Sequence, residues 1–223
     1  MEYERIIFDF NGTLVNDREL CLSILNYMLT KHNHLPVSEE KYLDSFMFPV
    51  VEYYKKVGFE IDSGKDDFNV LAHEFDTLYN SNFPSLKLFD DADKVLNLLS
   101  KKAKLYILSA TNQEDLDKEI SSLGIYHYFE KVIGIKNIFA HSKVQEAKDY
   151  FLNLSDFNPS KTCFIGDTTH DIEVSKFLNC QCYLTTAGHQ SKKVLYSAID
   201  KSHIVDSLTD FYNIVSGGQN DTK

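Results

Sequence analysis

Acidic and small polar residues follow two apolar runs of the chain, and their types are those that bind cations and anions. The run 5–8 leads into Asp-Phe-Asn-Gly-Thr at 9–13. The run 162–165 leads into Gly-Asp-Thr-Thr-His-Asp at 166–171, which carries two carboxylates four positions apart. Oxygen ligands suit a hard cation such as Mg²⁺. Helix capping by Asp171 would explain one of these two aspartates but not readily both.

Two further polar residues follow apolar runs later in the chain. The run 105–108 ends in Ser109, whose hydroxyl could donate a hydrogen bond to an anion. Lys143 follows the run 131–135 and lies near the start of a predicted helix. The helix dipole disfavours a cation at that end, so Lys143 invites an acidic partner, although a solvated surface lysine is the simpler interpretation of this residue alone.

The elements that would position these residues alternate along the chain. A short apolar run bounded by a turn signal is typical of a buried parallel strand. The pattern predicts a strand ending before Asp9, further strands at 104–110, 131–135, 162–165, 181–184 and 203–205, and helices at 90–99, 112–123, 142–152, 171–178 and 208–214. This alternation predicts an α/β fold with a doubly wound, Rossmann-like, parallel sheet. Ligands bind beyond the carboxyl ends of the strands in such sheets, where Asp9 falls.

A helical segment interrupts this alternation between residues 16 and 84. Apolar residues recur there at helical spacing, with breaks near Pro36, Pro49, Gly58 and Gly64. Some seventy residues are a reasonable size for a small domain. We therefore expect an α/β core at 1–15 and 85–215, a helical cap domain at 16–84 and a flexible tail at 216–223.

Composition excludes several classes of partner. The chain has 223 residues and a formal charge of −10, and no Lys/Arg-rich run offers a nucleic-acid or anionic membrane footprint. No apolar leader and no run of roughly eighteen apolar residues is present, so we expect a cytoplasmic protein. The cysteines lack zinc-type spacing and are expected to be buried free thiols: Cys21, Cys163, Cys180 and Cys182.

In chain order the polar residues are Asp-x-Asn-Gly-Thr, then Ser, then Lys, then Gly-Asp-x-x-x-Asp. With these motifs in this order, the sequence resembles the haloacid dehalogenase superfamily, in particular its phosphoglycolate-phosphatase-like members with a helical C1-type cap. The resemblance covers nearly the whole chain, because the helical insertion falls where that family places its cap. The third motif reads Ser142-Lys143-Val144 instead of the common Gly-Lys-Pro, which leaves Lys136 as an alternative for the family's lysine.

The resemblance implies a Mg²⁺-dependent phosphatase acting on a small phosphorylated metabolite, as a monomer or weak homodimer. Asp9 would attack phosphorus to give an aspartyl-phosphate, and Lys143 would neutralise the transferred oxygens. The implied metal ligands are Asp9, Asp167 and the carbonyl of Asn11, with Asp171 in the outer shell. The implied phosphate-binding residues are Gly12, Thr13, Ser109, Ala110 and Thr111. The implied substrate-selecting residues of the cap are Phe48 and Tyr53.

Asn11 departs from the family pattern, which usually has an acid/base aspartate here. Asparagine cannot exchange a proton at neutral pH. One interpretation is a phosphatase with another proton carrier, such as His170, a cap residue or a metal-bound water. Because Gly12 follows, deamidation of Asn11 to aspartate is a further hypothesis. A second interpretation is a phosphate-binding or regulatory protein with attenuated catalysis.

A third interpretation of Asn11 is a superfamily member that cleaves a carbon–halogen or carbon–phosphorus bond. Dehalogenases do not need the metal, so the Asp167 and Asp171 pair argues against that branch. Carbon–phosphorus cleavage uses a lysine of the cap, and the spacing does not select one among Lys31, Lys41, Lys55 and Lys56. This hydrolase activity is the minor alternative.

Overall fold

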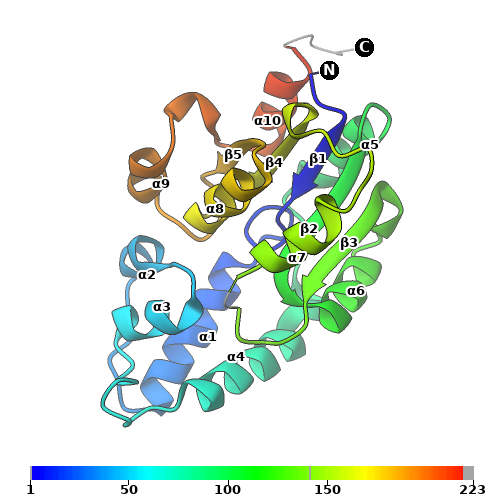
Figure 1. The fold of residues 1–223 in the computed structure, drawn as a ribbon. Helices are drawn as coiled ribbons and strands as arrows, with labels where there is room; N and C mark the ends of the chain where they lie inside the picture. Colours follow the sequence, from blue (N-terminus) through cyan, green and yellow to red (C-terminus); the bar gives the residue numbers. More distant parts are fainter. Residues whose placement is uncertain (1, 141, 218–223) are drawn as a thin grey trace.

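A six-stranded parallel sheet forms the centre of the protein (Figure 1). The computed structural model describes residues 2–140 and 142–217. The strands are β1 (Arg5–Phe8), β2 (Lys104–Asn112), β3 (Phe129–Ile135), β4 (Thr162–Gly166), β5 (Gln181–Thr185) and β6 (Ile204–Val205), in the order β3-β2-β1-β4-β5-β6. The doubly wound α/β fold predicted from the sequence is confirmed, although β2 extends two residues past the predicted end.

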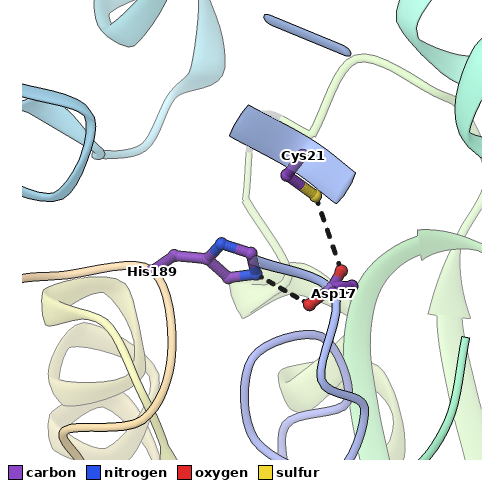
Figure 2. Close-up of side chains that lie close together, drawn as sticks. All are labelled: Asp17, Cys21 and His189. Carbon is purple, nitrogen blue, oxygen red and sulfur yellow. Dashed lines mark hydrogen bonds and ion pairs between the residues drawn. The ribbon is translucent and has the colours of Figure 1, made fainter. Parts of the chain in front are cut away.

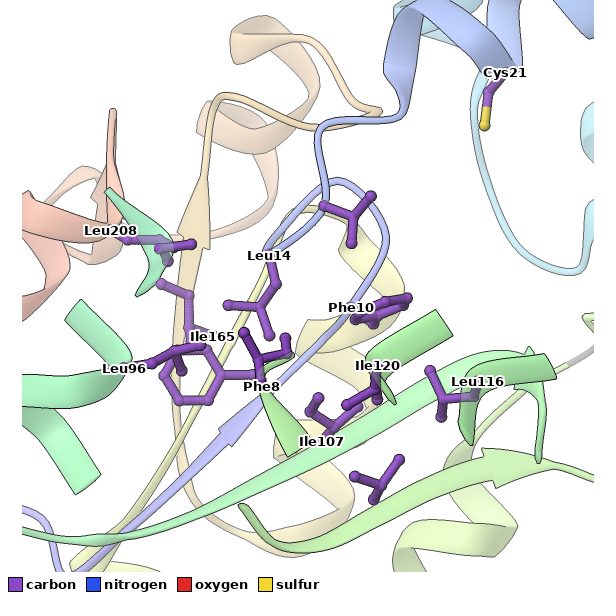
Figure 3. Close-up of a cluster of buried hydrophobic side chains, with 14 of the residues drawn as sticks. Phe8, Phe10, Leu14, Cys21, Leu96, Ile107, Leu116, Ile120, Ile165 and Leu208 are labelled. Atoms are coloured by element: carbon purple, nitrogen blue, oxygen red, sulfur yellow. The ribbon is translucent and has the colours of Figure 1, made fainter. Parts of the chain in front are cut away.

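Helices cover both faces of this sheet. They are α5 (Ala92–Ser100), α6 (Gln113–Ser122) and α10 (Leu208–Val215) on one face, and α7 (Val144–Phe151), α8 (Thr169–Leu178) and α9 (Lys192–Ala198) on the other. Figure 3 shows Phe8 among core side chains that include Leu96 and Leu208. Ile7 belongs to the cluster on the opposite face, with Phe151. Both faces of β1 are therefore buried, which explains its uninterrupted apolar run.

The sequence pattern did not predict α9. This helix has seven residues, and Leu195 is its one fully buried side chain, so it carries little periodic signal. Short 3-10 turns lie at 83–85, 126–128, 159–161 and 201–203. All four cysteines are free, as expected, and Cys180 is half-buried while the others are buried. Among the described residues no helix is both long and apolar enough to cross a membrane.

Four α-helices lie between β1 and α5 in the sequence. They are α1 (Arg18–Lys31), α2 (Glu39–Ser45), α3 (Val50–Val57) and α4 (Phe68–Asn82), drawn in blue to blue-green at the bottom of Figure 1. The two segments that connect these helices to the core lie side by side. The amide of Asn16 donates to the carbonyl of Lys87 at 3.0 Å, and the amide of Phe89 donates to the carbonyl of Leu14 at 3.0 Å. The division into core and cap domains stays a prediction. The tail expected at 216–223 lies outside the described residues from 218 onward.

Glu119 on α6 is a buried carboxyl group in this fold. It is 4% exposed, and within the described part of the chain neither carboxylate oxygen has a hydrogen-bond partner. Burial raises the pKa of Glu119 to about 8, with additional repulsion from Asp17 and Asp115. The neutral form is therefore the one that the folded state favours near neutral pH.

We expect Glu119→Gln to change how stability depends on pH. Because the folded pKa lies above the unfolded one, the contribution of Glu119 is fully present below about pH 4.5 and is lost as pH rises toward about 8. Each pKa unit corresponds to about 1.4 kcal/mol. The free energy of unfolding of Glu119→Gln, relative to that of wild type, should therefore be higher at pH 8 than at pH 5. Urea denaturation at both pH values measures this. Glu114→Gln, exposed on the same helix, is the control, and equal pH dependence in wild type and Glu119→Gln would contradict the prediction.

Candidate active site

Asp9 lies directly after the central strand, at the carboxyl end of the sheet. Its amide donates to the carbonyl of Ile165 on β4 at 2.8 Å, so the ladder continues one residue past β1. Asp9 is 8% exposed and lines a cavity of about 180 Å³. Burial raises the pKa of Asp9, Lys143 lowers it and Asp171 raises it again, which gives a pKa of about 6. The fold thus fixes a buried carboxylate at the edge of a cavity.

Lys143 is the cation beside Asp9. It is 2% exposed, and its Nζ forms ion pairs with Oδ1 of Asp9 and, at 2.8 Å, with Oδ1 of Asp171. Burial opposes the ammonium form, but the two carboxylates raise the pKa of Lys143 above its ordinary value. Lys136, the alternative lysine, is exposed directly after β3. The structure therefore brings Lys143, and not Lys136, to Asp9.

Asp171 lies in the first turn of α8 and serves two purposes. Its Oδ2 accepts from the amides of Asp167 and Thr168 at 3.1 and 2.9 Å, and from the Thr168 hydroxyl at 2.9 Å. A Cβ at Gly166 would lie 2.2 Å from this oxygen, so only glycine fits there. Asp171 thus forms a capping box with Thr168 and turns its other oxygen to Lys143.

Three carboxylates form a candidate magnesium site. Carboxylate oxygens of Asp9, Asp167 and Asp171 lie within 4.8 Å of one another, and all three residues are buried. Oδ1 of Asp167 has no hydrogen-bond partner among the described residues. Burial raises the pKa of Asp167 well above its ordinary value; His189 opposes this, and the charges of Asp9 and Asp171 add to it. A hard cation would relieve this repulsion and occupy the unpaired oxygen, so the donor set fits Mg²⁺.

The turn after Asp9 packs tightly against Asp167 of the fourth motif. Gly12 has φ of +69°, and a Cβ on it would lie 2.5 Å from Oδ2 of Asp167. Glycine is therefore required by both conformation and space. Thr13 is fully buried, and its hydroxyl has no hydrogen-bond partner among the described residues. Neither Gly12 nor Thr13 lines the cavity, so their contact with phosphate stays a prediction.

Three predicted residues at the end of β2 do line the cavity: Ser109, Ala110 and Thr111. The Ser109 hydroxyl donates to Oγ1 of Thr111 at 3.0 Å, and the Thr111 hydroxyl donates to Oδ1 of Asn11 at 2.8 Å. Parallel strands place their carboxyl ends at one edge, which is why residues a hundred positions apart meet here. These side chains gather beside Asp9 as the sequence predicts.

Three hydrogen bonds fix the orientation of the Asn11 side chain. Its Nδ2 donates to Oδ2 of Asp17 at 2.9 Å and to the Tyr79 hydroxyl at 2.7 Å. Its Oδ1 accepts from Thr111. An aspartate at position 11 would place a second carboxylate against Asp17. Asparagine therefore donates the hydrogen bond that Asp17 accepts here, which an ionised aspartate at position 11 could not do.

Asp17 is the centre of a hydrogen-bond cluster that the sequence analysis did not single out. Figure 2 shows its carboxylate between Sγ of Cys21, at 3.6 Å, and Nε2 of His189, at 3.1 Å. The Gly12 amide and the Tyr79 hydroxyl also donate to it, at 3.0 and 2.9 Å. Burial would raise the pKa of Asp17, but His189 and the hydrogen bonds lower it below its ordinary value. The one sequence feature that could have drawn attention to Asp17 is its position at the N-cap of α1, although its side chain makes no capping hydrogen bond.

Two histidines near the site, His189 and the candidate proton carrier His170, have different surroundings. His189 lines the cavity, and its Nδ1 lies 2.7 Å from the Tyr42 hydroxyl. Burial opposes its charged form, but the Asp17 ion pair raises the pKa of His189 to about 9. His170 does not line the cavity, and its Nε2 accepts from the amide of Lys143 at 3.2 Å. Burial lowers the pKa of His170.

Phe48 and Tyr53, the predicted selector residues, both line the cavity that contains Asp9. The Phe48 ring stacks on His170 with centroids 4.8 Å apart. Tyr53 is 4% exposed and packs against Phe46 at 5.0 Å. The structure thus brings both aromatic residues to the site, and their part in selectivity stays a prediction.

Comparisons with known proteins agree with this fold. Residues 6–185 match the family model of the haloacid dehalogenase-like hydrolases. A phosphoglycolate phosphatase of Synechococcus elongatus is 23% identical over 87% of this chain and 89% of its own length. Pyrophosphatase PpaX of Listeria monocytogenes is 22% identical over 77% of each chain. The structure of a haloacid dehalogenase-like hydrolase from Streptococcus pneumoniae superposes with a TM-score of 0.75 at 20% identity, covering 96% of this chain and 99% of that one.

The match covers well over half of the chain, so the protein belongs to the haloacid dehalogenase-like hydrolase family and is a hydrolase. The resemblance that the sequence motifs indicated is confirmed. The similarity to solved structures, at 20% identity or less, concerns the fold alone.

We predict that Asn11 and Asp17 are energetically coupled. Asn11→Asp would set a half-buried carboxylate against the buried one of Asp17 and should cost on the order of 1–3 kcal/mol of stability. Adding Asp17→Asn restores a donor and acceptor pair, so the double variant should be more stable than the two single losses imply. Urea denaturation of wild type, both single variants and the double variant gives the coupling energy. Simple additivity of the two losses would refute the coupling.

Proposed function

We propose that the protein is a Mg²⁺-dependent phosphatase that hydrolyses a small phosphorylated metabolite through an aspartyl-phosphate on Asp9. The observation that carries the proposal is the placement of Asp9, paired with Lys143 and within reach of two further carboxylates at the mouth of a cavity. Relatives named phosphoglycolate phosphatase and pyrophosphatase support phosphoryl chemistry. A cytoplasmic location and a monomeric or weakly dimeric state stay predictions.

The residues divide the work of the reaction. An Asp9 oxygen would bond to phosphorus while the bond from phosphorus to the leaving oxygen breaks, and water would then release phosphate from Asp9. Lys143 would neutralise the transferred oxygens, and Asp171 holds Lys143 in place. Asp9 and Asp167 would hold Mg²⁺, with the Asn11 carbonyl as the further proposed ligand. The bound cation would supply charge neutralisation between the attacking carboxylate and the phosphate.

A second candidate function rests on Asn11. Its amide cannot donate a proton to the leaving oxygen and later accept one from water, and general acid catalysis usually contributes about 10² to 10⁴-fold. A phosphate-binding or regulatory protein of the same fold, with attenuated catalysis, would tolerate this loss. The hydrogen bonds that engage the Asn11 amide with Asp17 and Thr111, and so keep it from serving the leaving oxygen, favour this candidate. Carbon–phosphorus hydrolysis remains the minor alternative, and no cap lysine lines the described part of the cavity.

Asp9→Asn tests the phosphatase proposal. We expect the variant to lose at least about 10³-fold of the magnesium-dependent turnover of p-nitrophenyl phosphate, because the nucleophile is removed. Asp62→Asn, at a side chain 79% exposed, is the matched control and should retain wild-type turnover. Equal rates in wild type and Asp9→Asn would disprove catalysis through Asp9 and leave the binding protein as the better interpretation.

Magnesium should also stabilise the fold, which can be measured without turnover. A cation that screens the three buried carboxylates favours the folded state by mass action, so the melting temperature should rise with Mg²⁺ concentration. Asp167→Asn should reduce this rise, whereas Asp62→Asn should not. A melting temperature of wild type that does not respond to millimolar Mg²⁺ would contradict the metal site.

A further inference from the structure

The cavity beside Asp9 has an aromatic wall. Aromatic residues from the α2–α4 region line it, among them Phe46, Phe48, Tyr53, Tyr54, Phe68 and Phe75. Tyr53 and Tyr54 are buried, and Phe75 stacks on Tyr79 with centroids 5.9 Å apart. Such a wall favours contact with another flat, apolar group. Since the phosphoryl group must lie at Asp9, the remainder of the substrate would face this wall.

The charges of the cavity disfavour an anionic leaving group. No Lys or Arg is found among the described residues that line it. Its cationic residue is His189, whose two nitrogens already contact Asp17 and Tyr42. Asp17 and Asp76 add negative charge to the lining. A carboxylate or a second phosphate would therefore be desolvated there without a free counter-ion, which is costly.

The hydrogen bonds of Asn11 indicate, separately from the cavity lining, which kind of oxygen can leave from phosphorus. The Nδ2 of Asn11 is engaged with Asp17 and Tyr79, and its Oδ1 with Thr111. Position 11 therefore gives no proton to the leaving oxygen. A phenolate, whose conjugate acid has a pKa near that of tyrosine, about 10, departs unprotonated far more readily than an alkoxide.

We propose that the substrate is the phosphate monoester of a phenolic hydroxyl on a small, uncharged aromatic molecule, bound with its ring against the aromatic wall. This inference rests on the phosphatase function proposed above. An Asp9 oxygen forms the new bond to phosphorus, and the bond between phosphorus and the aryl oxygen breaks. The electron pair leaves with the phenolate, which takes its proton from water. Water then cleaves the aspartyl-phosphate and regenerates Asp9.

Steady-state kinetics of the wild-type protein with Mg²⁺ tests the substrate class. We would compare phenyl phosphate, cyclohexyl phosphate, phosphoglycolate and pyrophosphate. We expect kcat/KM for phenyl phosphate to exceed that for cyclohexyl phosphate by about 100-fold or more, because no residue at position 11 protonates the alkoxide. It should also exceed the values for both anionic substrates. Higher kcat/KM with phosphoglycolate or pyrophosphate would overturn the inference while leaving the phosphatase function intact.

Binding separates failure of this inference from failure of the phosphatase function. Calorimetry of wild type with Mg²⁺ would compare phenylphosphonate with phosphonoacetate, neither of which carries a phosphate ester. Tighter binding of phenylphosphonate supports the aromatic class even if no ester is hydrolysed, in which case only the phosphatase function fails. Equal or tighter binding of phosphonoacetate overturns the inference.

A charge introduced into the wall should redirect selectivity. Phe75 is half-buried on α4, so a lysine there can extend along apolar surface into the cavity. Phe75→Lys should lower the ratio of kcat/KM for phenyl phosphate to that for phosphoglycolate by about tenfold or more, the change expected for about 1.4 kcal/mol. Phe75→Leu should lower kcat/KM for phenyl phosphate without raising kcat/KM for phosphoglycolate. Phe177→Leu, at a 41% exposed aromatic on α8, should leave the ratio unchanged; a ratio unaffected by Phe75→Lys contradicts the aromatic wall.

Discussion

Repulsion among three buried carboxylates is the constraint on which the site depends. Asp9 and Asp167 follow neighbouring strands, so the parallel ladder between β1 and β4 forces them together. Backbone amides satisfy one oxygen of Asp171, and Lys143 pairs with its other oxygen and with Asp9. Asp167 keeps an unpaired oxygen in the described structure. A site with this surplus of negative charge suits a divalent cation and, with that cation, an incoming phosphate.

A second constraint joins the inserted helices to the first motif. Asp17 at the start of α1 accepts from Asn11, from Tyr79 on α4 and from His189 after β5, and His189 contacts Tyr42 on α2. The group that fixes the Asn11 amide is therefore the group that ties these helices to the core. Position 11 carries an amide in this chain, and the carboxylate that this amide contacts is that of Asp17. Asn11 and the cavity-lining residues of the inserted helices thus belong to one hydrogen-bond network.

The cavity lining, and not the relatives, carries the information about the substrate. Identities of 20–24% accompany a shared fold, and the named relatives act on different phosphorylated compounds. The strand ends carry the groups that the proposed phosphoryl transfer would use, whereas the aromatic wall of the cavity comes from the α2–α4 region. That wall is aromatic and carries no described cation, so under the proposed function it would select the leaving group by shape and polarity.

The sequence alone determined the sheet and the position of its polar edge, because strand signals are local and both faces of β1 are buried. It therefore placed Asp9, Asp167 and Asp171 together and left the lysine open between two positions. Only the tertiary structure selected Lys143 and made Asp17 the partner of Asn11. Its bonds to Tyr79 and His189 join residues 62 and 172 positions apart, and no local pattern encodes such contacts. The sequence pattern gives Asp17 no role beyond a position before a helical segment; in the fold, packing buries it and gives its carboxylate five donors.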